Sequence, residues 1–232
     1  MLDGRWKANI EKGLQPVGAN IGRTGIKADH LTAFGVFMAA CAAVAIAMGQ
    51  LRIGLLLLVL TGLPDALDGA VAKASGTAGP RGAFFDSVAD RVSDALLLTG
   101  VAWYLAGTHP GRISLLPMAV LAASLIISYQ RAKAESLGFN AKGGIMERAE
   151  RVILLGFALL FDSLLIGVLW VMLVLTLVTA VQRFVKVWRQ ASVERPKVSP
   201  KRLARRRAAR ATRTGRTSPG VWQRRPGNRR TP

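Results

Sequence analysis

Long apolar runs alternate with short polar connections along most of this chain, and the lengths of the runs indicate its fold class. A helix needs about 20 mostly apolar residues to cross a bilayer. The fifth of the six candidate runs is the weakest, because only residues 152–161 are continuously apolar. The pattern predicts an all-α integral membrane protein with six transmembrane helices. These are expected at residues 31–48, 53–74, 83–106, 113–131, 145–161 and 164–188.

Basic residues are distributed unevenly between the two sides of the predicted spans. Lys and Arg collect before the first span and in the second and fourth connections, whereas the other side carries only Arg52, His109 and Arg112. Since short cytoplasmic loops carry an excess of Lys and Arg, both termini and the second and fourth connections are expected in the cytoplasm. The chain is therefore predicted to be a multi-pass protein of the cell (plasma) membrane.

Both ends of the chain are predicted to lie outside the spans. Leu2, Trp6, Ile10 and Leu14 recur every four residues, which indicates an amphipathic interfacial helix before the first span; an unstructured start is the alternative. The expected organisation is an amphipathic juxtamembrane segment 1–27, a transmembrane domain 28–188 and a basic disordered cytoplasmic tail 189–232.

The tail differs sharply in composition from the rest of the chain. After Trp188, fifteen residues are Lys or Arg, and Glu194 is the one acid. Such a segment cannot bury a core, so it is expected to be disordered. Each basic residue near an anionic bilayer contributes about 1 kcal/mol to binding. We therefore expect the tail to contact anionic membrane lipids, and we disfavour the rival hypothesis of a specific nucleic-acid partner, because a tethered tail meets lipid first.

Four aspartates interrupt the second and third apolar runs. A carboxylate at membrane depth costs about 2.5 to 3.5 kcal/mol on insertion scales, and such residues usually carry function. Asp65 and Asp68 are three residues apart, and Asp86 and Asp90 are four apart, so each pair would share one helix face. With no Cys/His signature beside them, these oxygen ligands favour Mg²⁺, or Mn²⁺, over zinc. The four carboxylates could hold two ions together with substrate phosphates.

Residues between the two pairs favour a large phosphate-bearing ligand. Gly69 and Gly82 remove side chains where such a ligand could approach the helix backbone. Lys73 and the segment 75–80, which contains Gly79, could cover a phosphate.

The spacing of these residues resembles a known signature. The chain reads D-x-x-D-G-x-x-A-K, then eight residues, then G-x-x-x-D-x-x-x-D from Asp65 to Asp90. This is very similar to the motif of the CDP-alcohol phosphatidyltransferase family. The departure is Lys73, where the family has arginine. Lysine keeps the positive charge but lacks the planar guanidinium with which arginine can bind a phosphate through two hydrogen bonds. Nucleotide affinity is therefore the property that this difference affects.

The resemblance implies a reaction and a set of roles. The family transfers a phosphatidyl group from CDP-diacylglycerol to an alcohol and releases CMP, and its members are homodimers. Asp65, Asp68 and Asp86 would hold metal, with Asp90 assisting and acting mainly as general base. Contacts to CDP-diacylglycerol would come from Ala28, Asp29, His30, Leu31, Gly69, Lys73, Gly79 and Gly82.

A second polar cluster bears on the acceptor alcohol. It lies at the predicted cytoplasmic ends of the last three spans and could bind a phosphate on the acceptor. Each cation has an alternative interpretation as a topology determinant that reaches lipid headgroups. Asp94, one turn beyond Asp90, is expected to form a hydrogen bond or a salt bridge within the helix bundle. The cluster consists of Ser128, Arg131, Lys133, Arg148, Arg151 and Arg183.

This cluster resembles that of the actinobacterial phosphatidylinositol-phosphate synthases within the family. The resemblance implies inositol phosphate as acceptor and phosphatidylinositol phosphate as product. The alternative within the family is a phosphatidylglycerophosphate synthase, which accepts glycerol 3-phosphate. A more remote alternative is a cation transporter that uses the aspartates as its binding site, but the glycines and the second cluster have no role in it.

Overall fold

The computed structural model describes residues 28–74 and 79–193, and the described part is helical throughout with no strand. The expected amphipathic helix before residue 28 and nearly all of the basic tail lie outside the described residues. The helices are α2 (Ala28–Ala47), α3 (Leu51–Ala74), α4 (Pro80–Thr108), α5 (Leu115–Ser136), α6 (Arg148–Leu160), the short 3-10 helix η1 (Asp162–Leu164) and α7 (Leu165–Ser192).

The all-α class is confirmed, and each predicted apolar run contains a helix. Within the described residues, three helical segments are long and apolar enough to cross a membrane: α2, α5, and η1 with α7. Helix α6 has 13 residues, which is fewer than the roughly 20 that a span requires. Six complete spans therefore remain a prediction, to which α3, α4 and α6 must each contribute.

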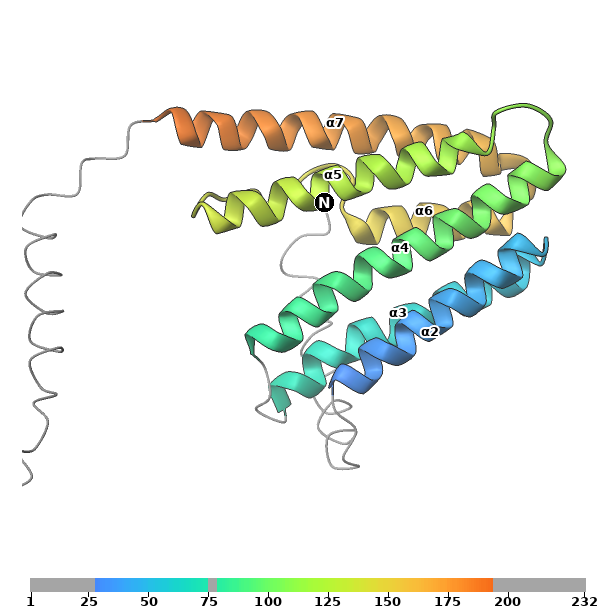
Figure 1. Ribbon diagram of the computed structural model, residues 1–232, viewed down its shortest axis with the longest axis horizontal. Helices are drawn as coiled ribbons and strands as arrows, with labels where there is room; N and C mark the ends of the chain where they lie inside the picture. The colour runs from blue at the N-terminus through green and yellow to red at the C-terminus, as the bar shows by residue number, and fades with distance from the viewer. Residues whose placement is uncertain (1–27, 75–78, 194–232) are drawn as a thin grey trace, which may run out of the picture. The chain divides into compact units, whose positions relative to one another are not determined.

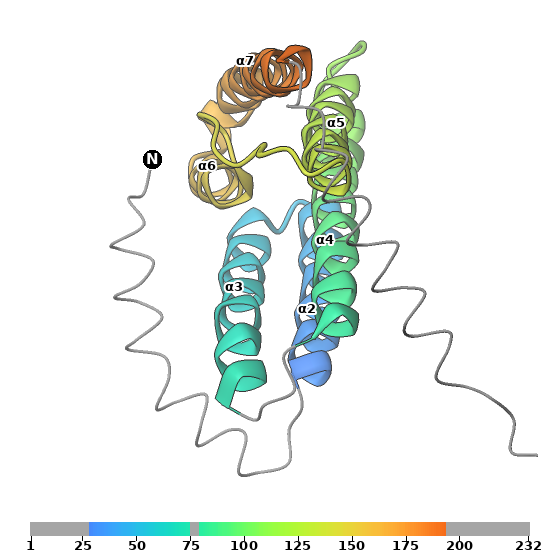
Figure 2. The same ribbon diagram turned by 90° about the vertical axis from the view of Figure 1, so that its left-hand side faces the viewer.

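Successive helices run in opposite directions, so their ends alternate between two sides of the molecule (Figure 1). The start of α2, the end of α3 and the start of α4 lie on one side, and the end of α5, the start of α6 and the end of α7 face the same way. Figure 2 shows α3 beside α2, and α6 above α3. This arrangement gathers the polar helix ends that the sequence analysis singled out.

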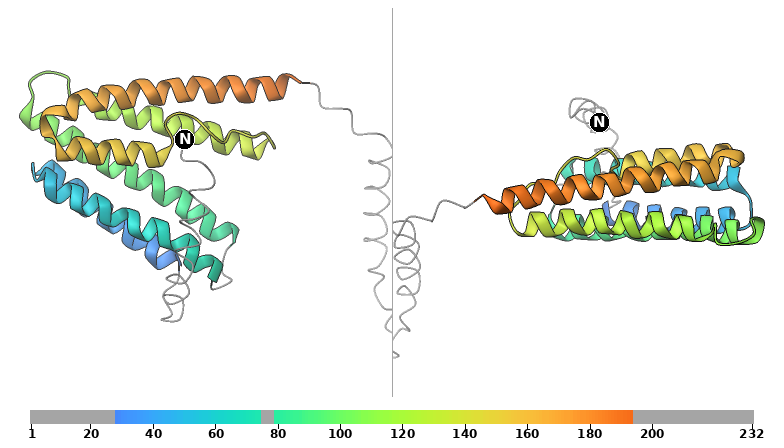
Figure 3. Two further views of the ribbon diagram at one scale, coloured as in Figure 1. Left: turned by 180° about the vertical axis from the view of Figure 1, so that it is seen from behind. Right: turned by 90° about the horizontal axis from the view of Figure 1, so that it is seen from above.

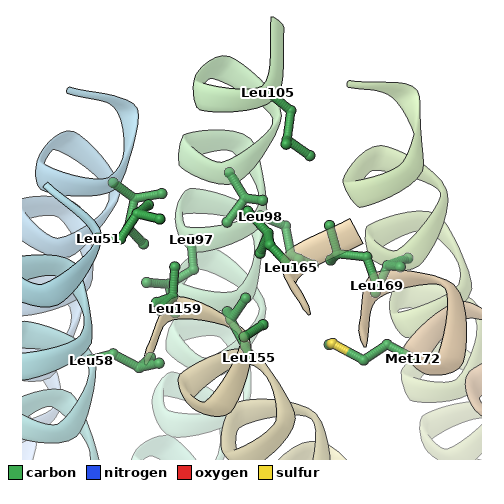
Figure 4. Packing of buried hydrophobic residues seen from close by; sticks show 14 of the residues in the cluster. Leu51, Leu58, Leu97, Leu98, Leu105, Leu155, Leu159, Leu165, Leu169 and Met172 are labelled. Atoms are coloured by element: carbon green, nitrogen blue, oxygen red, sulfur yellow. The ribbon is translucent and has the colours of Figure 1, made fainter. Parts of the chain in front are cut away.

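Leucines dominate the core between these helices. Leu58 of α3, Leu97 of α4 and Leu155 of α6 are each at most 4% exposed, and Figure 4 shows them converging with Leu169 and Met172 of α7. Between helices in a bilayer such side chains stabilise the bundle through van der Waals packing and not through removal from water. The core thus packs together helices that are distant in sequence. Figure 3 shows the arrangement of these helices from two further directions.

Helices α2 and α4 pack with their backbones in close approach. A Cβ atom added at Gly100 of α4 would lie 2.5 Å from the carbonyl oxygen of Ala43 on α2. Gly100 is buried, and Ala39, Ala42 and Ala43 are buried on α2. Small residues at helix contacts permit this close packing. The contact therefore sets the short distance between α2 and α4.

The far ends of the helices are joined by a separate polar contact. The Tyr104 hydroxyl on α4 donates to the Asp162 carboxylate of η1, at 3.2 and 3.3 Å to its two oxygens. Thr108 donates to the carbonyl oxygen of Tyr104 at 2.8 Å. The turn between α6 and α7 is therefore attached to the end of α4, away from the aspartates.

Candidate active site

Three acidic residues recur every four positions along one face of α4. Pro80 occupies the first turn of this helix and Gly79 precedes it, an arrangement in which proline costs no intrahelical hydrogen bond. Asp86, Asp90 and Asp94 follow in an uninterrupted helix, and all three are partly buried. The regular helix therefore aims three carboxylates toward one side of α4.

Residues from four helices line a narrow cleft at this face. Asp86, Ala89, Asp90 and Ser93 come from α4. The remaining lining residues are Thr32, Gly35 and Val36 of α2, Thr61 of α3 and Arg148 of α6. The cleft thus joins two carboxylates of the signature to one cation of the second cluster.

Asp90 is paired with cations from two helices. Its Oδ1 atom lies 2.8 Å from Nη1 of Arg148, and its Oδ2 atom lies 3.5 Å from Nη1 of Arg91. The Asp90 side chain is 20% exposed and that of Arg148 is 29% exposed. Because both remain partly accessible from the cleft, the ion pair can exchange partners with a ligand.

Asp94 confirms the expectation that it forms a salt bridge in the bundle. Its Oδ2 atom accepts a 2.9 Å hydrogen bond from Nη2 of Arg151. Its Oδ1 atom lies 3.5 Å from Nε of Arg148. Arg151 is buried, and a buried cation without a partner would be costly, so Asp94 compensates that charge while it also contacts Arg148.

Arg148 is held at the start of α6 by a capping box. The backbone N–H of Glu147 donates to the Glu150 carboxylate at 3.1 Å, and the Glu147 side chain accepts from the backbone N–H of Glu150. Such reciprocal bonds satisfy the free N–H groups of a first helical turn. Arg148 is therefore the first residue of a fixed helix, which is why α6 begins three residues later than the apolar run predicts.

The segment before α6 is attached to α7 by a stripe of polar side chains. Thr179 accepts from the backbone N–H of Met146 at 3.0 Å, and Lys186 donates to the carbonyl oxygen of Lys142 at 2.6 Å. Gln190 accepts from the N–H of Asn140 and donates to its carbonyl oxygen, at 2.9 and 2.7 Å. These contacts hold the loop that leads into Arg148.

Arg183 belongs to the same stripe and is 4% exposed. It donates from Nη1 to the carbonyl oxygen of Ile127 at 2.8 Å, and from Nη2 to that of Gly143 at 3.2 Å. Glu147 lies 3.6 Å from Nη2. The guanidinium thus links α5, α7 and the loop, and its Nε atom has no hydrogen-bond partner among the described residues.

The other predicted acceptor residues lie on α5. Arg131 forms an ion pair with Glu135 across one helical turn, at 3.1 Å. Lys133 is exposed and Ser128 is half-buried. Both cations lie near the end of α5, on the side of the molecule where α6 begins.

The predicted donor residues fall on α2, α3 and α4. The backbone of α3 is helical through Asp65, Asp68, Gly69 and Lys73, although their side chains lie outside the description. Ala28, Asp29, His30 and Leu31 form the first turn of α2, where Asp29 lies 3.4 Å from Arg81 of α4. Gly79 is exposed, and a Cβ atom added at Gly82 would meet no described atom within 4 Å.

Several cleft residues were not anticipated from the sequence. Thr32, Thr61 and Ser93 line the cleft, and Arg91 pairs with Asp90. Ser93 and Arg91 had a usable signal, because they lie three and one residues, respectively, from Asp90 on the helix that carries the aspartates. Thr32 and Thr61 had none, since a hydroxyl within a span is ordinarily satisfied by its own helix, as Thr32 is by the carbonyl oxygen of Ala28.

The described donor set is chemically compatible with a hard divalent cation. Asp86 and Asp90 place two carboxylates in one cleft, and Mg²⁺ is typically held by one or two carboxylates together with substrate phosphates. The described side chains contain no group of three or more His, Cys, Asp or Glu able to hold a metal ion. Asp65 and Asp68 lie outside that set, so the complete four-carboxylate site remains a prediction.

Residues 26–182 match the family model described as CDP-alcohol phosphatidyltransferase. The chain belongs to this family. It is therefore a membrane enzyme of phospholipid biosynthesis, a CDP-alcohol phosphatidyltransferase. The resemblance to this family that the sequence indicated is confirmed by this match, and the matched region contains the whole cleft.

Named relatives share most of their length with this enzyme. The archaetidylinositol phosphate synthase of Methanothermobacter thermautotrophicus is 36% identical over 173 residues, which cover 72% of this chain and 86% of the relative. The phosphatidylinositol phosphate synthase of Streptomyces avermitilis is 32% identical over 206 residues, covering 83% and 84%.

The fold is also similar to that of a crystallised enzyme. The phosphatidylinositol phosphate synthase of Mycobacterium tuberculosis with CDP-DAG bound aligns with a TM-score of 0.72 at 28% identity, over 80% of this chain and 98% of that one. Its complex with manganese and citrate aligns with a TM-score of 0.70 at 29% identity, over 79% and 93%. The manganese complex supports a divalent metal in this family.

Proposed function

We propose that the enzyme transfers a phosphatidyl group from CDP-diacylglycerol to inositol phosphate, giving phosphatidylinositol phosphate and CMP. The observation that carries this proposal is the 2.8 Å pair between Arg148 and Asp90, because it brings a cation of the acceptor cluster to a carboxylate of the signature. The two named relatives differ in their lipid, archaetidyl or phosphatidyl, but both names contain inositol phosphate. The acceptor is thus the shared part of the chemistry.

The donor side of the site consists of the first-turn residues of α2 and the signature on α3 and α4. Asp65, Asp68 and Asp86, with Asp90 assisting, are proposed to hold Mg²⁺ or Mn²⁺, with two ions as the expected number. A bound divalent ion would neutralise charge on the pyrophosphate and on the departing CMP. Lys73 and the nearby glycines Gly69, Gly79 and Gly82 are proposed to admit and contact the nucleotide, together with Ala28, Asp29, His30 and Leu31.

Asp90 is proposed to act as the general base. It would accept the proton of the acceptor hydroxyl as that oxygen bonds to the phosphorus carrying the diacylglycerol. The bond from this phosphorus to the bridging oxygen breaks at the same centre, and the electron pair leaves with CMP. Asp90 is suited to this role because its side chain lines the cleft and is partly exposed there.

The acceptor side is proposed to be formed by cations near the end of α5, at the start of α6 and in the second half of α7. Arg148 is the best placed of them, because it lines the cleft and is partly exposed. A guanidinium can bind a phosphate through two parallel hydrogen bonds. Arg131, Lys133 and Ser128 on α5 would add contacts to the acceptor. Arg151 and Arg183 are buried and would stabilise the residues around the site.

The membrane arrangement completes the proposal. Six spans would place both termini and the cleft on the cytoplasmic side, where CDP-diacylglycerol and a soluble acceptor meet. The amphipathic segment 1–27 would lie in the interface, and the tail 189–232 would contact anionic lipids. The enzyme is further proposed to form a homodimer in the plasma membrane.

Release of CMP by the purified enzyme tests this function. Each assay contains CDP-diacylglycerol and one acceptor: inositol phosphate, free inositol or glycerol 3-phosphate. CMP release is expected with inositol phosphate, to be abolished by a metal chelator and restored by Mg²⁺ or Mn²⁺. Release with glycerol 3-phosphate alone would replace the proposal with phosphatidylglycerophosphate synthesis, and ion flux without CMP release would favour a transporter.

A further inference from the structure

We infer that Asp94 is a positioning residue that orients Arg148 for acceptor binding. The observation is a chain of alternating charges across the contact between α4 and α6. Asp90 pairs with Arg148 at 2.8 Å, Arg148 approaches Asp94 at 3.5 Å, and Asp94 pairs with Arg151 at 2.9 Å. The inference rests on the proposed function, since it takes Arg148 to bind the acceptor phosphate.

The geometry gives Asp94 control over one end of the Arg148 guanidinium. The Asp94 carboxylate lies 3.5 Å from Nε, an electrostatic contact and not a hydrogen bond, whereas the Asp90 carboxylate lies 2.8 Å from Nη1. Because a guanidinium is planar, attraction at two of its nitrogen atoms favours one orientation. With Asp94 absent, Arg148 would lose one of its contacts with α4, and its guanidinium would be freer to rotate about the contact with Asp90.

Burial supports a positioning role rather than a direct contact with substrate. The Asp94 side chain is 13% exposed and that of Arg151 is 7% exposed, against 29% for Arg148. Asp94 is not among the residues that line the cleft, whereas Asp90 and Arg148 are. Asp94 therefore acts on the cleft through Arg148, with Arg151 as the counter-charge that keeps Asp94 in place.

Charge balance indicates what the loss of Asp94 would do. In the described part of the chain, three guanidinium groups, those of Arg91, Arg148 and Arg151, face two carboxylates in this network. If Asp94 becomes neutral, Arg148 loses one carboxylate contact and keeps the one with Asp90. Arg148 would then be drawn more closely to Asp90 and would be less able to engage an acceptor phosphate.

A double-mutant cycle tests this coupling. Asp94→Asn, Arg148→Ala and the double variant are compared with the full-length wild-type enzyme, and KM is measured separately for acceptor and CDP-diacylglycerol. We expect Asp94→Asn to raise the acceptor KM about tenfold, with little change in the CDP-diacylglycerol KM. In the Arg148→Ala background the same change should have less than about a twofold effect, because the residue through which Asp94 acts is gone.

Two controls separate positioning from a general loss of stability. Asp94→Glu keeps the charge and is expected to restore most of the acceptor affinity, and it serves if the asparagine variant does not fold. Asp162→Asn removes a carboxylate that contacts Tyr104 at the far ends of the helices, and neither KM should change. Equal effects of Asp94→Asn in both backgrounds, or equal rises in both KM values, would overturn the inference.

The cycle is run with whichever acceptor the wild-type enzyme uses. If that acceptor proves to be glycerol 3-phosphate, the proposed function fails, while coupling of Asp94 to Arg148 in the acceptor KM would still support the positioning role. If inositol phosphate is used and the coupling is absent, the positioning role fails and the proposed function stands.

Discussion

Arg148 at the start of α6 and Asp90 in α4 form an ion pair, with 2.8 Å between Nη1 and Oδ1. The two residues are 58 positions apart in the chain, and they come from the two polar clusters that the sequence assigns to acceptor and donor. Their contact joins the proposed donor side and acceptor side of the site in one cleft. It also places the proposed base beside the cation that is proposed to bind the acceptor.

Replacing Asp90 by asparagine is expected to lower the turnover rate about a hundredfold or more, because the amide keeps the shape of the side chain but cannot take the acceptor proton. CMP release at saturating concentrations of both substrates measures this. Asp162→Asn is the matched control, with an unchanged rate. Full activity of the Asp90→Asn variant would remove Asp90 from the role of base.

A methyl group at Gly82 is expected to weaken donor binding without weakening the fold. The added Cβ would meet no described atom within 4 Å, and alanine is preferred to glycine within a helix by about 1 kcal/mol. The CDP-diacylglycerol KM should rise about tenfold if a ligand approaches the backbone here. Gly107→Ala, in the same helix with equally open surroundings, should leave KM unchanged. An identical KM in both variants would show that no ligand approaches Gly82.

Gly100→Ala is expected to destabilise the bundle by about 1 to 3 kcal/mol, since its Cβ would lie 2.5 Å from the Ala43 carbonyl oxygen and would push α2 and α4 apart. Thermal unfolding of the purified protein in detergent gives the change. Gly107→Ala is again the control and should not lower the melting temperature. Equal melting temperatures for the two variants would contradict the close packing of α2 on α4.

Arg183→Met is expected to destabilise the protein by about 1 to 3 kcal/mol, because the carbonyl oxygens of Ile127 and Gly143 would lose a charged donor. Lys186→Met, at an exposed neighbour that donates to one carbonyl oxygen, should change stability by less than about 0.5 kcal/mol. Thermal unfolding compares the two. Comparable losses of stability would mean that burial does not distinguish Arg183 from the rest of the stripe.

Much of the fold could be predicted because apolar length is a local property of the sequence. The helices start within three residues of the expected apolar runs, and the largest difference is at the end of α5, which reaches Ser136 and not residue 131. Helix α6 starts three residues later than its run. There the Glu147–Glu150 capping box, and not the loss of apolar residues, sets the first turn. Whether α6, at 13 residues, crosses a bilayer depends on its surroundings, which a count of apolar residues cannot supply.

The candidate site was predictable in its residue types and only partly in its contacts. Spacing alone placed Asp86, Asp90 and Asp94 on one helix face. It could not show that Arg148 reaches Asp90 or that Arg183 is occupied by backbone carbonyl oxygens, because both depend on how α6 and α7 pack against distant helices. The stripe at positions 179, 183, 186 and 190 has helical spacing in the sequence, but its partner is a loop backbone that carries no recognisable pattern.

Identification of the lipid product under competition tests the proposed reaction most directly. The purified enzyme would receive CDP-diacylglycerol, Mg²⁺ and equal concentrations of inositol phosphate, free inositol and glycerol 3-phosphate, and the lipid formed would be identified by mass spectrometry. Phosphatidylinositol phosphate is the expected main product, with CMP released in equal amount. Phosphatidylglycerophosphate or phosphatidylinositol as the main lipid would contradict the assignment of the acceptor site to Arg148 and its neighbours.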